Sequence, residues 1–104
     1  MSRRKTQFDI GKHRLRELKC FCYQYPEWKS MYDSIDGWDG GGDVTSRDGI
    51  KRADLIRNIT MIEECANSTD RSLLGFVTVE GSSLPPELWY SNRIFFWKLS
   101  QMRG

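Results

Sequence analysis

The spacing of apolar residues constrains the fold of this chain more than any other feature of its sequence. Residues three or four apart lie on the same side of an α-helix. Apolar residues recur at these spacings in four runs, over residues 8–25, 26–35, 50–66 and 86–102. No run of comparable length alternates with the period of two that a half-buried strand shows. The sequence therefore predicts an all-α fold, a small domain of four to five helices.

Individual residues indicate where these helices begin and end. Pro26 has no backbone N–H, so it suits the first turn of a second helix better than the interior of the first. Thr45 and Ser46 are candidate N-caps for the helix that runs to about residue 66. The final helix begins at Pro86 or, alternatively, near Ser91 after a short turn. These boundaries predict a tightly connected first pair of helices and a long third helix.

The segment between the third and final helices carries weaker patterns. We expect a short turn of helix at Leu73 and Leu74. Residues 76–80 alternate as a strand does, but one short run without a partner favours an extended linker. In the final helix, the residues expected to face inward are Leu88, Phe95, Leu99 and Met102.

Length and cysteine content set the broad class. A chain of 104 residues favours a single domain over residues 1–104, because domains cluster near 100–150 residues. No apolar run reaches the roughly 18 residues that cross a bilayer. Three cysteines cannot all pair within one chain, which favours a reducing compartment. We therefore expect a cytoplasmic protein that makes no contact with a membrane.

The net charge of +2 conceals a segregation of charge along the chain. Residues 1–30 carry a net charge of +5, residues 31–48 carry −4, and residues 88–104 carry +3 with no acid. Screening limits the reach of a charge to about 8–10 Å at physiological salt, so local patches matter more than the sum. The two basic ends, which include a predicted N-terminal arm over residues 1–7, favour a surface that faces phosphates. The alternative is chance clustering on a solvated surface.

Residues 36–46 form an acidic, glycine-rich stretch that predicts a loop. Its acids do not follow the alternate positions of a calcium-binding EF-hand, and Arg47 stands where that loop needs its last glutamate. No Gly-Lys-Ser/Thr follows the glycines, so a phosphate loop is excluded too. Trp38 has no evident core role here, and exposed tryptophan is a common interface anchor. The candidate protein-interface residues are therefore Trp38, Asp36, Asp39 and Asp43.

The residues needed for enzyme chemistry are sparse. His13 is the only histidine, and it lies in a basic helix where no nucleophile and acid can be grouped around it. Cys20 and Cys22 point to different sides of that helix, and Cys65 is remote in sequence, so four paired zinc ligands are lacking. The cysteines are most simply small core residues. We expect no enzyme activity, no metal and no cofactor.

Two stretches carry a resemblance to a known family. They are Leu18–Lys29, whose most specific part reads Gln-Tyr-Pro-Glu-Trp-Lys, and Asp43–Ala66, which contains Ile-Lys-Arg-Ala-Asp-Leu. Together they resemble small proteins carried by phages and prophages of Gram-positive bacteria, and the resemblance covers nearly the whole chain. It implies a DNA-binding regulator akin to phage late-gene activators. It also implies a C-terminal helix-turn-helix-like segment that opens near Val77-Thr78 and ends in a basic, aromatic helix.

The chain departs from that family in its last helix. Relatives carry three or four basic residues ahead of the aromatic pair, whereas here the matching residues are Ser91, Asn92, Arg93 and Ile94. Pro85-Pro86 stands where a first helix of the motif would lie, so we expect a degenerate helix-turn-helix-like part. Because phosphate contacts from Lys and Arg supply most non-specific affinity for DNA, the loss of charge predicts weakened binding.

The first functional hypothesis is a DNA-binding regulator of a phage or prophage. The last helix would read bases, with Asn92 suited to adenine and Arg93 to guanine, while the arm and the remaining cations hold the backbone. The aromatic residues at 89–97 are candidates for stacking on bases. Aromatic residues at helical spacing more commonly belong to the core, and we expect this above all for Phe95. The nucleic-acid-binding residues are then Arg3, Arg4, Lys5, Asn92, Arg93, Lys98 and Arg103.

The alternative hypothesis is a small phage inhibitor of the anti-CRISPR type. It would bind a host nucleic-acid-processing protein, such as an RNA-guided nuclease or a polymerase, through Trp38 and the acidic loop. A third possibility is a homodimer whose aromatic C-terminal helix forms the interface.

Overall fold

The computed structural model describes residues 8–35 and 52–104. Its helices are α1 (Lys12–Tyr23), α2 (Tyr25–Ile35), α3 (Arg52–Asn67), the single-turn α4 (Leu74–Val77) and α5 (Trp89–Arg103). Two short 3-10 helices, η1 (Arg71–Leu73) and η2 (Pro86–Leu88), lead directly into α4 and α5. No residue in these two ranges belongs to a strand. The all-α prediction is therefore confirmed for the described residues.

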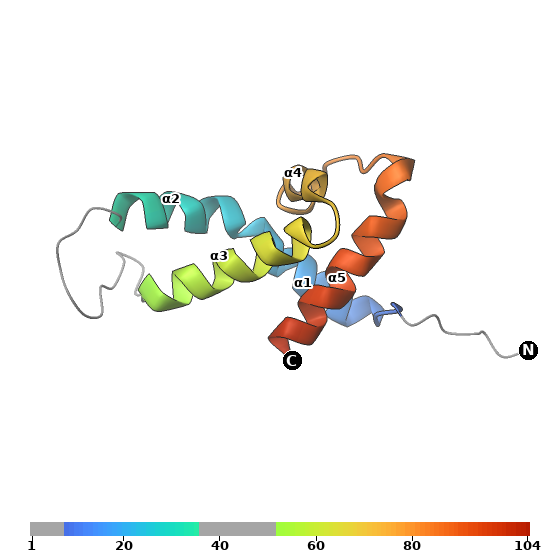
Figure 1. The fold of residues 1–104 in the computed structure, drawn as a ribbon, viewed down its shortest axis with the longest axis horizontal. Helices are drawn as coiled ribbons and strands as arrows, with labels where there is room; N and C mark the ends of the chain where they lie inside the picture. Colours follow the sequence, from blue (N-terminus) through green and yellow to red (C-terminus); the bar gives the residue numbers. More distant parts are fainter. Residues whose placement is uncertain (1–7, 36–51) are drawn as a thin grey trace, which may run out of the picture.

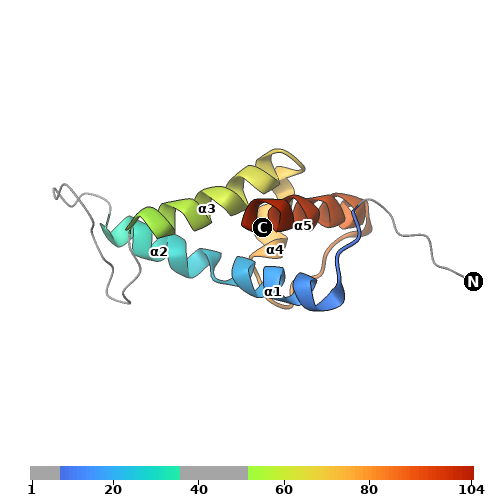
Figure 2. The same ribbon diagram turned by 90° about the horizontal axis from the view of Figure 1, so that it is seen from below.

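The helices are arranged in two layers. α1 and α2 follow one another nearly end to end in one layer, and α3 and α5 lie in the other (Figure 2). α2 packs along α3 as a hairpin that extends to one side, while α1 packs against α5 at the opposite side (Figure 1). α3 also contacts α5, η1 and α4. It is therefore the element that joins the hairpin to the rest of the molecule.

Pro26 explains why α1 and α2 are separate helices. A continuous helix would need the N–H of residue 26 to donate to the carbonyl four residues earlier, and proline has no N–H. At the junction the Gln24 N–H donates to the Phe21 carbonyl (3.3 Å), and the Gln24 carbonyl accepts from Trp28 (2.9 Å). α2 begins at Tyr25, one residue before the position that the sequence predicts.

The hydrophobic core is built mainly from α1, α3 and α5. Phe95 and Leu99 of α5 are fully buried, as predicted, and Phe95 meets Phe96 edge to face with ring centres 5.0 Å apart. Edge-to-face pairs of this kind are worth about 0.5–1.5 kcal/mol beyond the area they bury. The other buried apolar residues are Leu18, Phe21, Cys22, Trp28, Leu55, Ile59, Ile62, Cys65, Ala66, Leu73, Val77, Leu88 and Phe96.

Polar contacts join the two layers at both ends. At the hairpin, the Tyr25 hydroxyl donates to Glu63 Oε2 (2.5 Å), which also faces Lys29 Nζ at 3.5 Å. Burial, together with Glu63, raises the pKa of Tyr25 above its usual range. At the other end, Arg14 Nη2 donates to the Ser100 carbonyl (3.3 Å), which ties α1 to α5.

The prediction of an extended linker over residues 76–80 is wrong. Helix continues through Gly75 to Val77, because η1 and α4 form one continuous helical stretch. Asp70 caps its start by accepting from the Ser72 N–H (3.0 Å), and the Thr78 hydroxyl closes its end by donating to the Leu74 carbonyl (2.6 Å). A turn then follows at Gly81, whose φ of +81° is accessible to glycine at no steric cost.

Other expectations change in detail. The final α-helix begins at Trp89, between the two predicted starts, since residues 86–88 form the 3-10 turn η2. Met102, expected to face inward, is 47% exposed because it lies in the last turn of α5, past the main core. Cys20 is exposed, unlike the other two cysteines, so its assignment to the core is wrong. The candidate caps Thr45 and Ser46 lie outside the described residues.

The described helices include none with the length and apolar character of a membrane span.

Val77 and Val79 offer a matched test of the corrected segment. Both would share one face of a strand, but Val77 is 5% exposed and Val79 is 50% exposed. We expect Val77→Ala to lower the free energy of unfolding by about 2 kcal/mol, from two lost methyl groups and the cavity left behind. Val79→Ala should change it by less than about 0.5 kcal/mol. Urea denaturation of both variants checks this, and equal losses would contradict the helical assignment.

Candidate nucleic-acid interface

Three cations form a stripe along α1. Lys12, Arg16 and Lys19 are spaced at i, i+4 and i+7, so they project from the same side of the helix, and all three are exposed. At about 1.5 Å of rise per residue the stripe extends over roughly 10 Å. It faces away from Leu18 and Cys22, which point into the core. The result is a row of positive charge on the outer side of α1.

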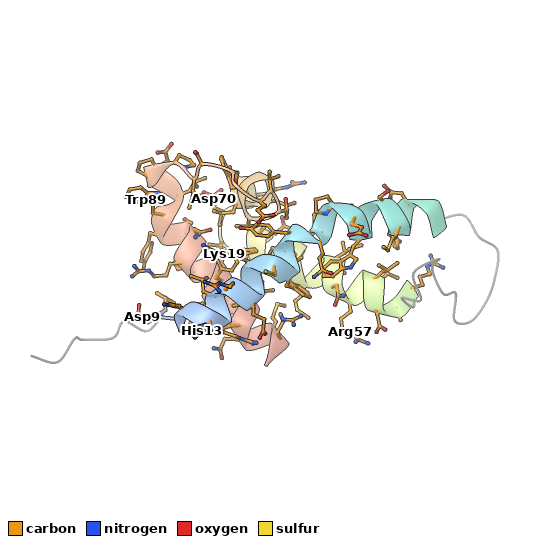
Figure 3. All side chains as sticks on the ribbon, turned by 180° about the vertical axis from the view of Figure 1, so that it is seen from behind. Asp9, His13, Lys19, Arg57, Asp70 and Trp89 are labelled. Carbon is orange, nitrogen blue, oxygen red and sulfur yellow. The ribbon has the colours of Figure 1, made fainter. Side chains whose placement is uncertain are left out.

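The first turn of α5 is the second part of the interface. Trp89 and Tyr90 are 61% and 64% exposed, and Arg93 beside them is exposed as well. The Trp89 indole N–H donates to the Leu84 carbonyl (3.1 Å), so its polar atom is satisfied and the ring orientation is fixed. Figure 3 shows Trp89 and Lys19 in the same half of the molecule, with Arg57 of the α2–α3 hairpin in the other half. An aromatic face and a cation are thus presented together on α5.

Phe8, the first described residue, packs against α5. Its ring lies edge to face against Tyr90 and Trp97, with ring centres 6.2 and 5.3 Å apart. Tyr90 and Trp97 are seven residues apart on α5 and so lie on one side of it. Phe8 is therefore held against that side of the helix.

A groove of about 330 Å³ opens between the start of the described chain and α5. Asn92 and Arg93 line it from α5, and Asp9 lines it from the segment before α1. Its remaining walls are apolar or aromatic, formed by Phe8, Ile10, Leu15, Leu84, Trp89 and Phe96. A smaller hollow of about 110 Å³ shares Asn92, Leu84 and Phe96 with it and is lined by Lys19 and Tyr23 of α1. Asn92 therefore lies where the two hollows adjoin.

A larger groove of about 660 Å³ lies between the end of α3 and the second half of α5. Cys65, Trp97 and Met102 line it, and the Cys65 thiol lies 3.3 Å from the Met102 sulfur. Its cation, Lys98, is already hydrogen-bonded to Ser68. The cation of this groove is therefore already engaged, whereas Arg93 and Lys19, which line the hollows around Asn92, have no ion pair among the described residues.

The predicted nucleic-acid-binding residues fall into three groups: those in the first half of α5, those already engaged by other parts of the protein, and those outside the described ranges. Arg93 is exposed and Asn92 is half-buried, both in the first half of α5. Lys98 Nζ donates to the carbonyl and hydroxyl of Ser68 (2.9 and 3.2 Å), at the negative end of the α3 dipole. The Arg103 guanidinium stacks 3.9 Å from the centre of the Phe21 ring. The residues outside the described ranges are Arg3, Arg4 and Lys5.

The predicted protein interface cannot be placed in the same way. Trp38, Asp36, Asp39 and Asp43 all lie outside the described residues, so their role stays a prediction.

The charge distribution sets this end of the molecule apart. α1 and α5 together carry seven Lys and Arg residues and a single acid, Glu17, which is paired with Arg14 at 2.6 Å. Elsewhere, Lys29 and Arg57 face acids of their own, Glu63 and Asp54. Within the described chain, the exposed cations with neither an ion pair nor a stacked ring are Lys12, Arg16 and Lys19 on α1, Arg93 on α5 and Arg71 on η1, so four of these five lie on α1 and α5.

Lys12, Arg16 and Lys19 are not among the site residues that the sequence predicts. Their i, i+4, i+7 spacing was the signal that could have identified them, because it is the same periodicity that defines the apolar face. The sequence leaves both stacking on bases and burial in the core open for Trp89. The structure leaves this side chain 61% exposed, with its indole N–H bonded to the Leu84 carbonyl.

No cluster of three or more His, Cys, Asp or Glu side chains suited to a metal ion occurs among residues 8–35 and 52–104. The buried thiols are poor ligands at neutral pH, since they hold their protons tightly. Burial raises the pKa of Cys22 to about 12 and, helped by Glu64 but opposed by Lys98, the pKa of Cys65 to about 11.

The chain matches no family model, no curated protein and no solved structure.

The raised thiol pKa values predict a loss of stability at alkaline pH. Between their usual value of 9.0 and about 12, the cysteines ionise in the unfolded chain while Cys22 stays protonated in the folded one. The contribution of Cys22 ionisation to the free energy of unfolding should therefore be constant below pH 9. The free energy of unfolding should fall as the pH rises above 9. Denaturation at pH 7 to 11 measures the slope, which Cys22→Ala should make shallower and Cys20→Ala should not change.

Proposed function

We propose that this protein is a DNA-binding regulatory protein of the phage or prophage type that the sequence resemblance implies. The observation that carries the proposal is the presence of four exposed cations without an internal ion pair on α1 and the first half of α5. Lys12, Arg16 and Lys19 come from α1, and Arg93 comes from α5. Lys and Arg contacts to phosphates supply most of the sequence-independent affinity for DNA.

The geometry favours different roles for α1 and α5 in binding DNA. The α1 stripe, about 10 Å long, contacts the phosphate backbone and orients the protein. The first turn of α5 approaches the bases, since the N-terminal residues of a recognition helix contact base edges in helix-turn-helix proteins. Arg93 is placed for this role, whereas Lys98 and Arg103, already engaged within the protein, contribute to binding chiefly by holding α5 in position.

In this proposal the C-terminal part is a degenerate helix-turn-helix. The continuous η1 and α4 stretch, which precedes the Pro85-Pro86 segment where the sequence resemblance puts the first helix, takes the place of that helix, and α5 takes the place of the recognition helix. The connection over residues 78–85 is about twice as long as the three- to four-residue turn of that motif. The longer connection carries Leu84, whose carbonyl holds the Trp89 ring, so it shapes the surface that α5 presents.

Charge-neutralising variants test the proposal. We expect Arg16→Gln/Lys19→Gln to weaken binding to a 20-base-pair duplex about tenfold or more near 0.1 M salt, because two phosphate contacts are lost. The slope of log affinity against log salt should become shallower by about two. Fluorescence anisotropy at several salt concentrations measures both quantities.

A matched control removes two charges elsewhere. Lys29→Gln/Arg57→Gln changes the net charge equally but acts on the hairpin end, where both cations already face acids. We expect its DNA affinity to stay within about twofold of the parent. Absence of duplex binding at low salt, or an affinity independent of salt, would refute the proposed function.

A further inference from the structure

We propose that the 330 Å³ groove around Asn92 binds an unpaired nucleobase, with adenine preferred. The inference deepens the proposed function and rests on it, because the cations of α1 and α5 would deliver the strand. Asn92 would then act within the groove, not in a major groove of intact duplex. Four properties of the groove support this assignment.

The size and walls of the groove suit a flat aromatic ligand. Its volume lies near the lower end of the roughly 300–1,000 Å³ of small-molecule sites, which are mostly apolar with a few placed polar groups. Phe8, Trp89 and Phe96 contribute rings to its lining. Stacking on aromatic side chains is the common means of holding unpaired bases.

The two aromatic walls near the opening are fixed before any ligand arrives. Trp89 is held by its bond to the Leu84 carbonyl, and Phe8 is held by its contacts with Tyr90 and Trp97. A ring that is already oriented loses little conformational freedom on binding. The 61% exposure of Trp89 leaves ring surface accessible to a base.

Asn92 supplies a polar group that can read the base. Its side chain is half-buried in the groove and, within the described part of the chain, makes no hydrogen bond. A carboxamide offers a donor and an acceptor together, which match the N7 acceptor and N6 amino group of adenine. Leaving such a group unsatisfied is costly once water is displaced, so a ligand that satisfies it is favoured.

Charge at the groove favours a base over a phosphate inside it. Asp9 brings a carboxylate into the lining, which repels an anion. Arg93, which is exposed, and Lys19 of the adjoining hollow provide positive charge for the phosphates on either side of the base. The arrangement thus combines an aromatic cradle with cations for the backbone, as in proteins that bind single strands.

The test compares duplexes that differ at one position. Fluorescence anisotropy would measure binding to a fully paired 20-base-pair DNA and to the same duplex with one extra unpaired adenine or thymine. We expect the duplex with the unpaired adenine to bind about tenfold more tightly than the paired one. Asn92→Leu should reduce the preference for adenine over thymine, and Trp89→Leu should reduce the preference for either bulge.

Control variants separate the groove from the backbone contacts. Asn58→Leu, which alters a half-buried amide on α3, should leave the preference unchanged. Lys12→Gln/Arg16→Gln, which alters two exposed cations of α1 that line neither hollow, should weaken all three duplexes by a similar factor and preserve their order. Competition with free adenosine monophosphate identifies the source of the base. If micromolar to millimolar nucleotide displaces the adenine-bulged duplex, the groove recognises a free nucleotide as well as a base within a strand.

The outcomes for the two proposals are distinct. Equal affinity for paired and adenine-bulged duplexes, with normal salt dependence, would overturn the inference and leave the proposed function intact. A different result would overturn only part of the inference. If both bulged duplexes bind equally more tightly than the paired duplex, and Asn92→Leu leaves these affinities unchanged, the role of Asn92 and the preference for adenine are overturned. Failure to bind any of the three duplexes would overturn both proposals.

Discussion

The burial of one face of α5 is the interaction on which the rest of the structure depends. Phe95 and Leu99, both fully buried, and the nearly buried Phe96 hold that helix in the core with α1 and α3. Removing a buried phenylalanine typically costs about 3–5 kcal/mol, a large share of the stability of a small domain. Because this face of α5 points inward, Trp89, Tyr90 and Arg93 are left at the surface. The position of the candidate interface is thus a consequence of core packing.

Internal contacts divide the cations of α1 and α5 into two groups. Arg14, Lys98 and Arg103 bind a carbonyl, a helix end or an aromatic ring, and so stabilise the contacts among α1, α3 and α5. Lys12, Arg16, Lys19 and Arg93 have no such ion pair or stacked ring within the described chain. Sequence alone gives both groups the same charge, and only their partners distinguish a structural cation from one that is available to a ligand.

The periodicity of the sequence predicts the helices well and their surroundings poorly. The runs that became α1, α2, α3 and α5 were identifiable because each must bury an apolar stripe, and Pro26 marked the break between the first two. Residues 76–80 were misread because five residues sample less than two helical turns, and the contacts that decide the matter, such as Thr78 to the Leu74 carbonyl, are local hydrogen bonds without a period. Asn92 and Arg93 were predicted as site residues. The groove that surrounds Asn92 was not, because segments some eighty residues apart form it.

The contact of Phe8 with α5 has a consequence for binding thermodynamics. A charged segment tethered next to its target acts at a high effective concentration, because its attachment point is confined and only its remaining residues explore space. Edge-to-face contacts with Tyr90 and Trp97 set that attachment point on the same helix that carries Arg93. In the proposed complex, the predicted arm and α5 would be two linked ligands of one strand, so that two weak affinities would combine into a stronger one.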